Sequence, residues 1–320
     1  MPLTPSSFRP HPLVRSPHIQ TIVPSLFRRP QPPNAAPLFL DTEDGDILRY
    51  IHVAGGNSRL VIISHGLEGS FQSPYVLGMM NALSERGWDV LAWNMRGCGD
   101  EPNKLVTWYH SGQSKDLRTI VSFADTLGYS EIALVGFSVG GNITLKYLGE
   151  GGRALQGKIS RAVVISVPMD LAGAAAQLAR PANAIYMQYL LRPLRARMRQ
   201  KAKQFPNTFD LHGLASITSF HEFDTRFTAP FHGFSSVEEY WEQSSSLKYV
   251  DGVAIPTLAI TAFDDPFLSR TCIADDVAQK LSFFTLEPSQ HGGHVGFIET
   301  PRLTSTWSEQ RTCSFLERGA

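Results

Sequence analysis

A short apolar run over Ile132–Val135 is followed at once by Gly136-Phe137-Ser138-Val139-Gly140-Gly141, and helix-compatible residues begin at Asn142. A serine on so tight a strand-to-helix turn must adopt unfavourable backbone angles, and the flanking glycines avoid collisions with neighbouring elements. The turn would raise the Ser138 hydroxyl above a sheet edge. It would also leave the Val139 N–H at a helix N-terminus, where partial positive charge favours a developing oxyanion. The motif predicts a nucleophilic serine, whereas the plain alternative is a glycine-rich turn with an incidental serine.

Four short apolar segments have the composition of strands that are buried on both faces of a sheet. They span Leu60–Ser64, Asp89–Trp93, Ile132–Val135 and Ala162–Val167. Helical stretches over 75–86 and 114–127 lie between them, so strands and helices alternate with short connections. A hairpin that turns at Asp44-Gly45-Asp46 precedes them. The pattern predicts an open, mostly parallel α/β sheet with helices on both faces.

The alternation stops after Pro168. The stretch from Leu171 to about Lys203 is rich in Ala, Leu, Arg, Gln and Met and predicts helices, and no strand-like run follows until Thr257. Its aromatic and methionine side chains suit ordinary packing better than a cofactor site. Strands are expected again over 257–261 and 281–286, and a closing helix over 307–316. We predict an N-terminal extension over 1–37 packed on the core, a core formed by 38–168 and 249–320, and a helical cap inserted over 169–248.

Charge and composition exclude several classes of protein. The 320 residues carry 29 Lys plus Arg and 29 Asp plus Glu, so the net charge is zero and no nucleic-acid partner is expected. With 42% hydrophobic and 18% charged residues, the chain suits a globular core better than a coiled coil or a disordered segment. Three scattered cysteines provide neither a disulfide framework nor a metal-binding pair. No continuous apolar run suggests a signal peptide or a membrane span, so we expect a cytoplasmic protein.

A nucleophilic serine needs a histidine base and a carboxylate that orients this base. After a serine turn of this kind, the acid and then the histidine are expected further along the chain. The apolar run Leu258–Ala262 brings Asp264 and Asp265 to the end of a buried strand. The small residue at Ala262, with an acid three positions later, favours Asp265. Asp264 is the alternative, and both carboxylates could instead cap the turn.

Two histidines compete for the role of the base in Gln290-His291-Gly292-Gly293-His294-Val295-Gly296-Phe297. The glycines leave this loop free to approach the serine, and the apolar residues after His294 can anchor it. We therefore favour His294 over His291. A metal site formed by the two histidines would need a third ligand, and the helical spacing typical of such sites is absent. We expect no metal and no cofactor.

A second oxyanion donor is expected in the loop after the first parallel strand, where His65-Gly66-Leu67-Glu68-Gly69 stands. The N–H of Leu67 is the natural candidate, as the partner of the Val139 N–H. His65 is expected to be structural, because the base has already been assigned elsewhere.

Further sequence blocks accompany the serine turn. They are Pro17–Thr21 with Pro24–Arg29, His65–Ser70, Arg96–Asn103, Tyr109–Gly112, Glu222–Asp224 and His291–Phe297. Together they resemble the YheT-like branch of the α/β-hydrolase superfamily along nearly the whole chain. The stretch Gly99-Asp100-Glu101-Pro102 departs from that branch, whose members often have serine before the Glu-Pro pair. This departure bears on substrate contacts, because the loop borders the expected pocket.

The resemblance implies an α/β-hydrolase fold, a triad on Ser138, Asp265 and His294, and activity on acyl esters that include lipids. We expect a serine carboxylesterase for short- to medium-chain or monoacylglycerol-like esters. The same triad also fits a thioesterase, an amidase or an acyltransferase, and a non-catalytic binding protein of this fold is a further alternative. Arginines and apolar residues near the N-terminus leave peripheral membrane contact open, and the sequence does not set the oligomeric state.

Overall fold

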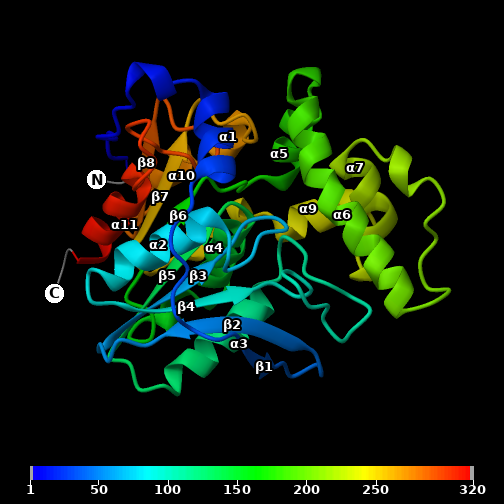
Figure 1. The fold of residues 1–320 in the computed structure, drawn as a ribbon, viewed down its shortest axis with the longest axis horizontal. Helices are drawn as coiled ribbons and strands as arrows, with labels where there is room; N and C mark the ends of the chain where they lie inside the picture. Colours follow the sequence, from blue (N-terminus) through cyan, green and yellow to red (C-terminus); the bar gives the residue numbers. More distant parts are fainter. Residues whose placement is uncertain (1–2, 318–320) are drawn as a thin grey trace.

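The strands form one sheet in the computed structural model, in the order β1-β2-β4-β3-β5-β6-β7-β8 (Figure 1). The structure describes residues 3–317, so residues 1–2 of the expected N-terminal extension and residues 318–320 of the expected core lie outside the described residues. The bounds are β1 Leu38–Asp41, β2 Ile47–Val53, β3 Arg59–Ser64, β4 Asp89–Asn94, β5 Glu131–Phe137, β6 Arg161–Ile165, β7 Thr257–Ala262 and β8 Phe284–Ser289. The β1–β2 and β2–β4 pairs are antiparallel and the others are parallel. The predicted hairpin and mostly parallel sheet are confirmed.

Alternate side chains of the central strands enter two cores, one on each face of the sheet. In β3, Leu60 and Ile62 pack on one face while Val61 and Ile63 pack on the other, and all four are fully buried. The helices around the sheet are α2 Pro74–Ser84, α3 Ser114–Asp125, α4 Val139–Gly151, α10 Asp275–Ala278 and α11 Trp307–Glu317. Helices α2 and α11 join the core of Val61, and α3 and α4 join the core of Leu60. Each buried side chain of this size contributes about 1.5–3 kcal/mol, so the two layers fix the central strands.

The last strand is displaced from its predicted position. The sequence predicts it over 281–286, but β8 covers Phe284–Ser289. Leu281 is partly exposed and Phe283 is exposed, and both precede the strand. Their apolar side chains therefore shift the predicted start of the strand to an earlier position in the sequence than the observed start. Pro288 has no N–H to donate, which β8 tolerates because it is an edge strand.

Helices fill the chain between β6 and β7 and stand beside the sheet (Figure 1). They are α5 Leu171–Leu178, α6 Ala184–Gln204, α7 Phe220–Phe223, α8 Ala229–Phe231 and α9 Val237–Ser244, with a π-helical turn over Asp224–Thr228. The predicted helical stretch is interrupted where Pro181 opens a 3₁₀ turn, because proline cannot continue the hydrogen-bond ladder. The division of the chain into core and cap stays a prediction. Within residues 3–317, none of the helices is both long and apolar enough to cross a membrane.

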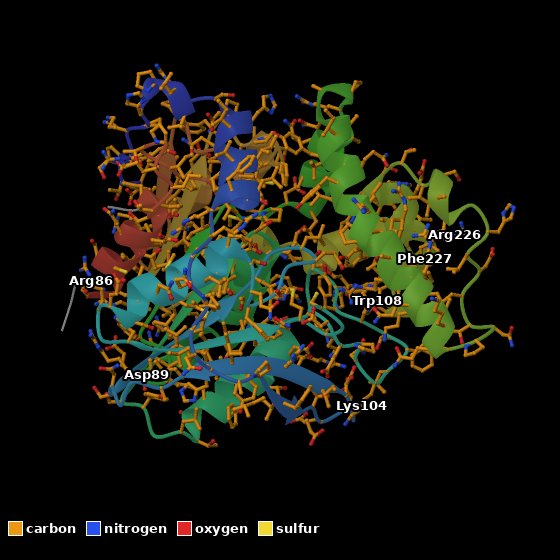
Figure 2. The ribbon with its side chains drawn as sticks, in the orientation of Figure 1. Arg86, Asp89, Lys104, Trp108, Arg226 and Phe227 are labelled. Carbon is orange, nitrogen blue, oxygen red and sulfur yellow. The ribbon has the colours of Figure 1, made fainter. Side chains whose placement is uncertain are left out.

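The loop after β4 packs against this helical layer. The His232 Nε2 atom lies 2.7 Å from the Trp108 carbonyl oxygen, and the Trp108 ring contacts the rings of Phe209 and Phe231. Figure 2 shows Trp108 on the same side of the molecule as Phe227 of the π-helical turn. Residues 108–111 of this loop and residues of the helical segment therefore line the same cavity, which is described below.

The proline-rich N-terminal segment contains a helix that the sequence does not predict. Helix α1 covers Pro17–Phe27, with a proline at its first position, where the missing N–H has no cost. The buried Gln20 side chain donates to the carbonyls of Val14 (2.7 Å) and Ile298 (2.8 Å) and accepts from the Ile298 N–H (2.8 Å). These bonds fix α1 against the chain that follows β8.

Candidate active site

Ser138 occupies the sharp turn that the sequence predicts. It follows β5 directly, α4 begins at the next residue, and its backbone angles are φ 50° and ψ −120°. Such a conformation costs about 1–3 kcal/mol and persists only where the surroundings hold it. The Ser138 N–H donates to the Ile165 carbonyl (2.9 Å), and its carbonyl accepts from the Asn142 N–H (3.0 Å). A Cβ at Gly136 would lie 2.6 Å from the Gly141 Cα, so a side chain there would force the turn apart.

A continuous hydrogen-bonded chain links Ser138, His294 and Asp265. The His294 Nε2 atom lies 2.9 Å from Ser138 Oγ, and its Nδ1 atom lies 2.8 Å from Asp265 Oδ2. The Asp265 side chain is fully buried, and its other oxygen accepts from the Phe267 N–H (2.8 Å). The Phe267 ring stacks on the imidazole at a centroid distance of 4.2 Å. The structure thus brings together, at the carboxyl ends of β5, β7 and β8, the three side chains that the sequence predicts.

The loop that carries His294 rests directly on α1. The His294 N–H donates to Thr21 Oγ1 (2.9 Å), and a Cβ at Gly293 would lie 2.6 Å from the Pro17 carbonyl oxygen. On the other side, the Val295 N–H donates to Ser166 Oγ (3.0 Å). The position of the imidazole therefore depends on a helix that sequence reasoning misses. The only signal for it is the Pro17–Thr21 block of the family resemblance.

The two alternative residues, Asp264 and His291, pair with each other. Their side chains approach to 3.2 Å, and Arg15 Nε donates to the second ring nitrogen of His291 (2.6 Å). The other Asp264 oxygen accepts from the Gly293 N–H (3.0 Å), and burial raises the pKa of this carboxyl. These contacts brace the loop beside His294. Among residues 3–317, no three His, Cys, Asp or Glu side chains are grouped so that they could hold a metal ion.

The N–H groups of Leu67 and Val139 are available beside Ser138. Within the described part of the chain neither N–H donates to a protein acceptor, and both residues line the cavity that contains Ser138. His65 is engaged elsewhere, since its Nδ1 lies 2.7 Å from the Gly66 carbonyl oxygen and its Nε2 accepts from the Met95 N–H (3.0 Å). Burial lowers the pKa of His65 to about 4, so it stays neutral and structural.

A buried ion pair joins the loop of Leu67 to the long helix α6. Arg197 donates to both carboxylate oxygens of Glu68 at 2.9 and 2.8 Å, and it also donates to the Gly97 carbonyl. The Tyr109 hydroxyl accepts from the Glu68 N–H (2.9 Å) and donates to its carboxylate (3.0 Å). Sequence reasoning misses this pair, because 129 residues separate its members.

A cavity of about 590 Å³ opens onto Ser138 and His294, and apolar side chains form most of its lining. Helix α1 contributes Ile22, Pro24 and Leu26 to the lining, and α5 and α6 contribute Leu171, Leu178, Tyr186, Tyr189 and Leu194. The region of α7 to α9 adds a polar group, the half-buried carboxylate of Asp224. This carboxylate accepts from Thr228 Oγ1 (2.6 Å) and Trp241 Nε1 (2.9 Å), and burial raises its pKa to about 6. Sequence reasoning assigns no role to Asp224.

Comparison with known proteins agrees with this architecture. A family model described as the alpha/beta hydrolase fold matches residues 59–301. The chain is 33% identical over 313 residues to the Escherichia coli protein named "Putative esterase YheT", with 93% of this chain and 89% of YheT covered. It is 28% identical over 268 residues to a monoacylglycerol lipase of Saccharomyces cerevisiae, with 81% of this chain and 59% of the lipase covered.

Among solved structures, esterase Pf2001 of Pyrococcus furiosus has a similar fold, with a TM-score of 0.60 at 18% identity over 91% of this chain and 99% of that one. The sheet order, the turn at Ser138, the family model and the extent of the match to YheT all agree. The chain belongs to the α/β-hydrolase family, in the branch that contains YheT.

Proposed function

We propose that this hydrolase is a serine carboxylesterase that cleaves acyl esters through an acyl-enzyme on Ser138. The observation that carries the proposal is the chain of contacts from Ser138 Oγ to His294 (2.9 Å) and from His294 to Asp265 (2.8 Å). A base in contact with the nucleophile, and itself oriented by a buried carboxylate, is the arrangement that activates a serine hydroxyl at neutral pH.

In the first half of the reaction, His294 Nε2 takes the Ser138 proton while Oγ attacks the ester carbonyl carbon. The carbonyl oxygen becomes an oxyanion that accepts hydrogen bonds from the Leu67 and Val139 N–H groups. Each such donor contributes roughly 3–4 kcal/mol to transition-state stabilisation. The tetrahedral intermediate then expels the alcohol, which receives the proton from His294. The Asp265 carboxylate stabilises the imidazolium throughout.

In the second half, water attacks the acyl-enzyme, and His294 again takes a proton in the attack and returns it to Ser138 Oγ. The acid product leaves with the acyl group, and the free serine is restored. Asp265 is buried, and its Oδ1 atom accepts a hydrogen bond from the Phe267 N–H, so the carboxylate stays fixed through both halves of the reaction.

The cavity supports a proposed substrate class of esters with short to medium acyl chains, which includes monoacylglycerol-like esters. Its volume of about 590 Å³ lies within the range of ligand pockets, and its apolar lining suits an acyl chain. The carboxylate of Asp224 gives the cavity a polar group that suits a hydroxylated alcohol portion. The lipase activity in the name of the yeast relative supports the same substrate class.

Hydrolysis of p-nitrophenyl acetate and butyrate by the wild type and by Ser138→Ala tests the proposal. We expect kcat to fall on the order of 10⁴-fold or more in Ser138→Ala. Ser130→Ala is the matched control, because Ser130 is exposed and, within residues 3–317, its hydroxyl bonds only to the Ser58 carbonyl. A fluorophosphonate probe should label the wild type and not Ser138→Ala. Equal turnover by a folded Ser138→Ala protein would remove Ser138 as the nucleophile. Parallel thioester and amide substrates identify a different leaving-group preference.

A further inference from the structure

The charges of this neutral chain are strongly segregated. Residues 1–37 contain four arginines and residues 171–209 contain seven arginines and lysines, yet neither segment contains an Asp or Glu. All 29 acidic residues lie elsewhere. These two segments supply α1, α5 and α6, which line the same cavity. Two chain segments that contain basic but no acidic residues therefore supply part of the cavity lining.

Exposed apolar side chains lie at the same place. On α1, Ile22 and Leu26 are 37% and 46% exposed, and on α6, Ile185 and Tyr189 are 80% and 60% exposed. Each pair is spaced by four residues, so its members share one helix face, and all four side chains border the cavity. Phe27, which is 66% exposed, extends the α1 pair. The cavity rim is thus apolar on two helices, and Figure 1 shows α1 and the start of α6 on the same upper side of the molecule.

The exposed face of α6 continues from apolar to basic. Arg192 and Arg199 follow Ile185 and Tyr189 at helical spacing on this face, and both are exposed. Arg29, just beyond α1, is exposed as well. Within residues 3–317, none of these three arginines forms an ion pair, in contrast to the buried Arg28 and Arg197, which pair with Glu309 and Glu68. Their charges have no counterpart in the described part of the chain.

We propose that the rim of the cavity, formed by α1 and the exposed face of α6, docks on an anionic lipid bilayer. The side chains of Ile22, Leu26, Phe27, Ile185 and Tyr189 enter the boundary between headgroups and acyl chains, and the unpaired arginines meet lipid phosphates. Apolar side chains flanked by basic ones are the combination that binds such interfaces. A lipid surface fits better than a protein partner because the apolar rim is continuous with the apolar cavity. An acyl chain can therefore pass from bilayer to cavity without crossing water.

Co-sedimentation of the full chain with vesicles tests the docking surface directly. The wild type should bind vesicles that contain phosphatidylglycerol and bind pure phosphatidylcholine vesicles more weakly, and added salt should release it. Each basic residue near an anionic surface strengthens binding about fivefold, so Arg29→Glu/Arg192→Glu should weaken binding by at least twentyfold. Ile185→Ser/Tyr189→Ser should weaken binding to both kinds of vesicle. Hydrolysis of p-nitrophenyl butyrate without lipid should be unchanged in Arg29→Glu/Arg192→Glu.

Arg153→Glu and Leu127→Ser are the matched controls, because both positions are exposed on other parts of the surface. The proposal is overturned if the wild type stays in the supernatant with both vesicles, or if the controls lose as much binding as the rim variants. Because the choice of a lipid surface draws on the proposed function, the experiment is repeated with Ser138→Ala. If this inactive variant binds vesicles as the wild type does, docking does not depend on catalysis. The docking proposal and the esterase proposal can then fail independently of each other.

Discussion

Replacement of Arg197 by methionine should destabilise the protein by about 3–5 kcal/mol, because it leaves the Glu68 carboxylate buried without its partner. The two side chains are only 5% and 8% exposed, so water cannot replace the lost contact. Methionine also removes the bond to the Gly97 carbonyl and the contact of 3.3 Å with the Cys98 sulfur. The loop of Leu67 would lose its attachment to α6, so kcat for p-nitrophenyl butyrate should fall more than KM rises.

Urea unfolding followed by tryptophan fluorescence measures this loss. The double variant Arg197→Met/Glu68→Gln no longer contains the uncompensated charge. Its loss of unfolding free energy should therefore be smaller than the sum of the losses of the two single variants by about 1–3 kcal/mol. Arg86→Met is the matched control, because the side chains of Arg86 and its partner Glu317 are 50% and 36% exposed. An exposed pair of this kind contributes less than about 1 kcal/mol. Additive single losses, or an Arg197→Met loss no larger than that of Arg86→Met, would refute the reasoning.

Two other carboxylates give sharp predictions. Asp265→Asn should lower kcat by about 10⁴-fold, because the amide favours the wrong tautomer of His294, while Asp264→Asn should cause a much smaller loss. Steady-state kinetics compares the two, and equal losses would contradict the assignment of Asp265. For Asp224, burial raises the pKa from 3.8 to about 6, so the associated stabilisation is complete below about pH 3.8 and disappears as the pH rises through 6. The unfolding free energy of the wild type relative to Asp224→Asn should fall by about 3 kcal/mol between roughly pH 4 and pH 8, and a constant difference in urea titrations would disprove this.

The fold could be predicted from the sequence because local pattern and tertiary structure agree in the core. β-Branched runs such as Leu60–Ser64 are buried on both faces, and their bounds match the observed strands closely. The predicted bounds of β8 are three residues too early, because apolar residues precede the strand and a proline lies inside it. It also misses α1, because a proline-rich segment with little helix propensity is stabilised by tertiary contacts of Gln20 that no local pattern reveals.

The sequence likewise predicts some parts of the candidate site and not others. Ser138, Asp265 and His294 each follow a recognisable strand, so their meeting at one sheet edge follows from the topology of a parallel sheet. The Glu68–Arg197 pair and the placement of Asp224 in the cavity wall depend on how the helices between β6 and β7 pack beside the sheet and against its loops. Those contacts join distant parts of the chain, and sequence periodicity carries no information about them.

The support of the His294 loop by α1 has a consequence for synthesis of the protein. Thr21 accepts a hydrogen bond from the N–H of His294, which lies 273 positions further along the chain. Helix α1 therefore leaves the ribosome long before the His294 loop has been synthesised. Contacts between residues so far apart in the sequence form late, because the entropy of closing the intervening chain opposes them. The central strands can therefore associate while the imidazole is still without its support. Hydrolytic competence would then arise as one of the last events in maturation, and a nascent chain would carry Ser138 in an inactive setting.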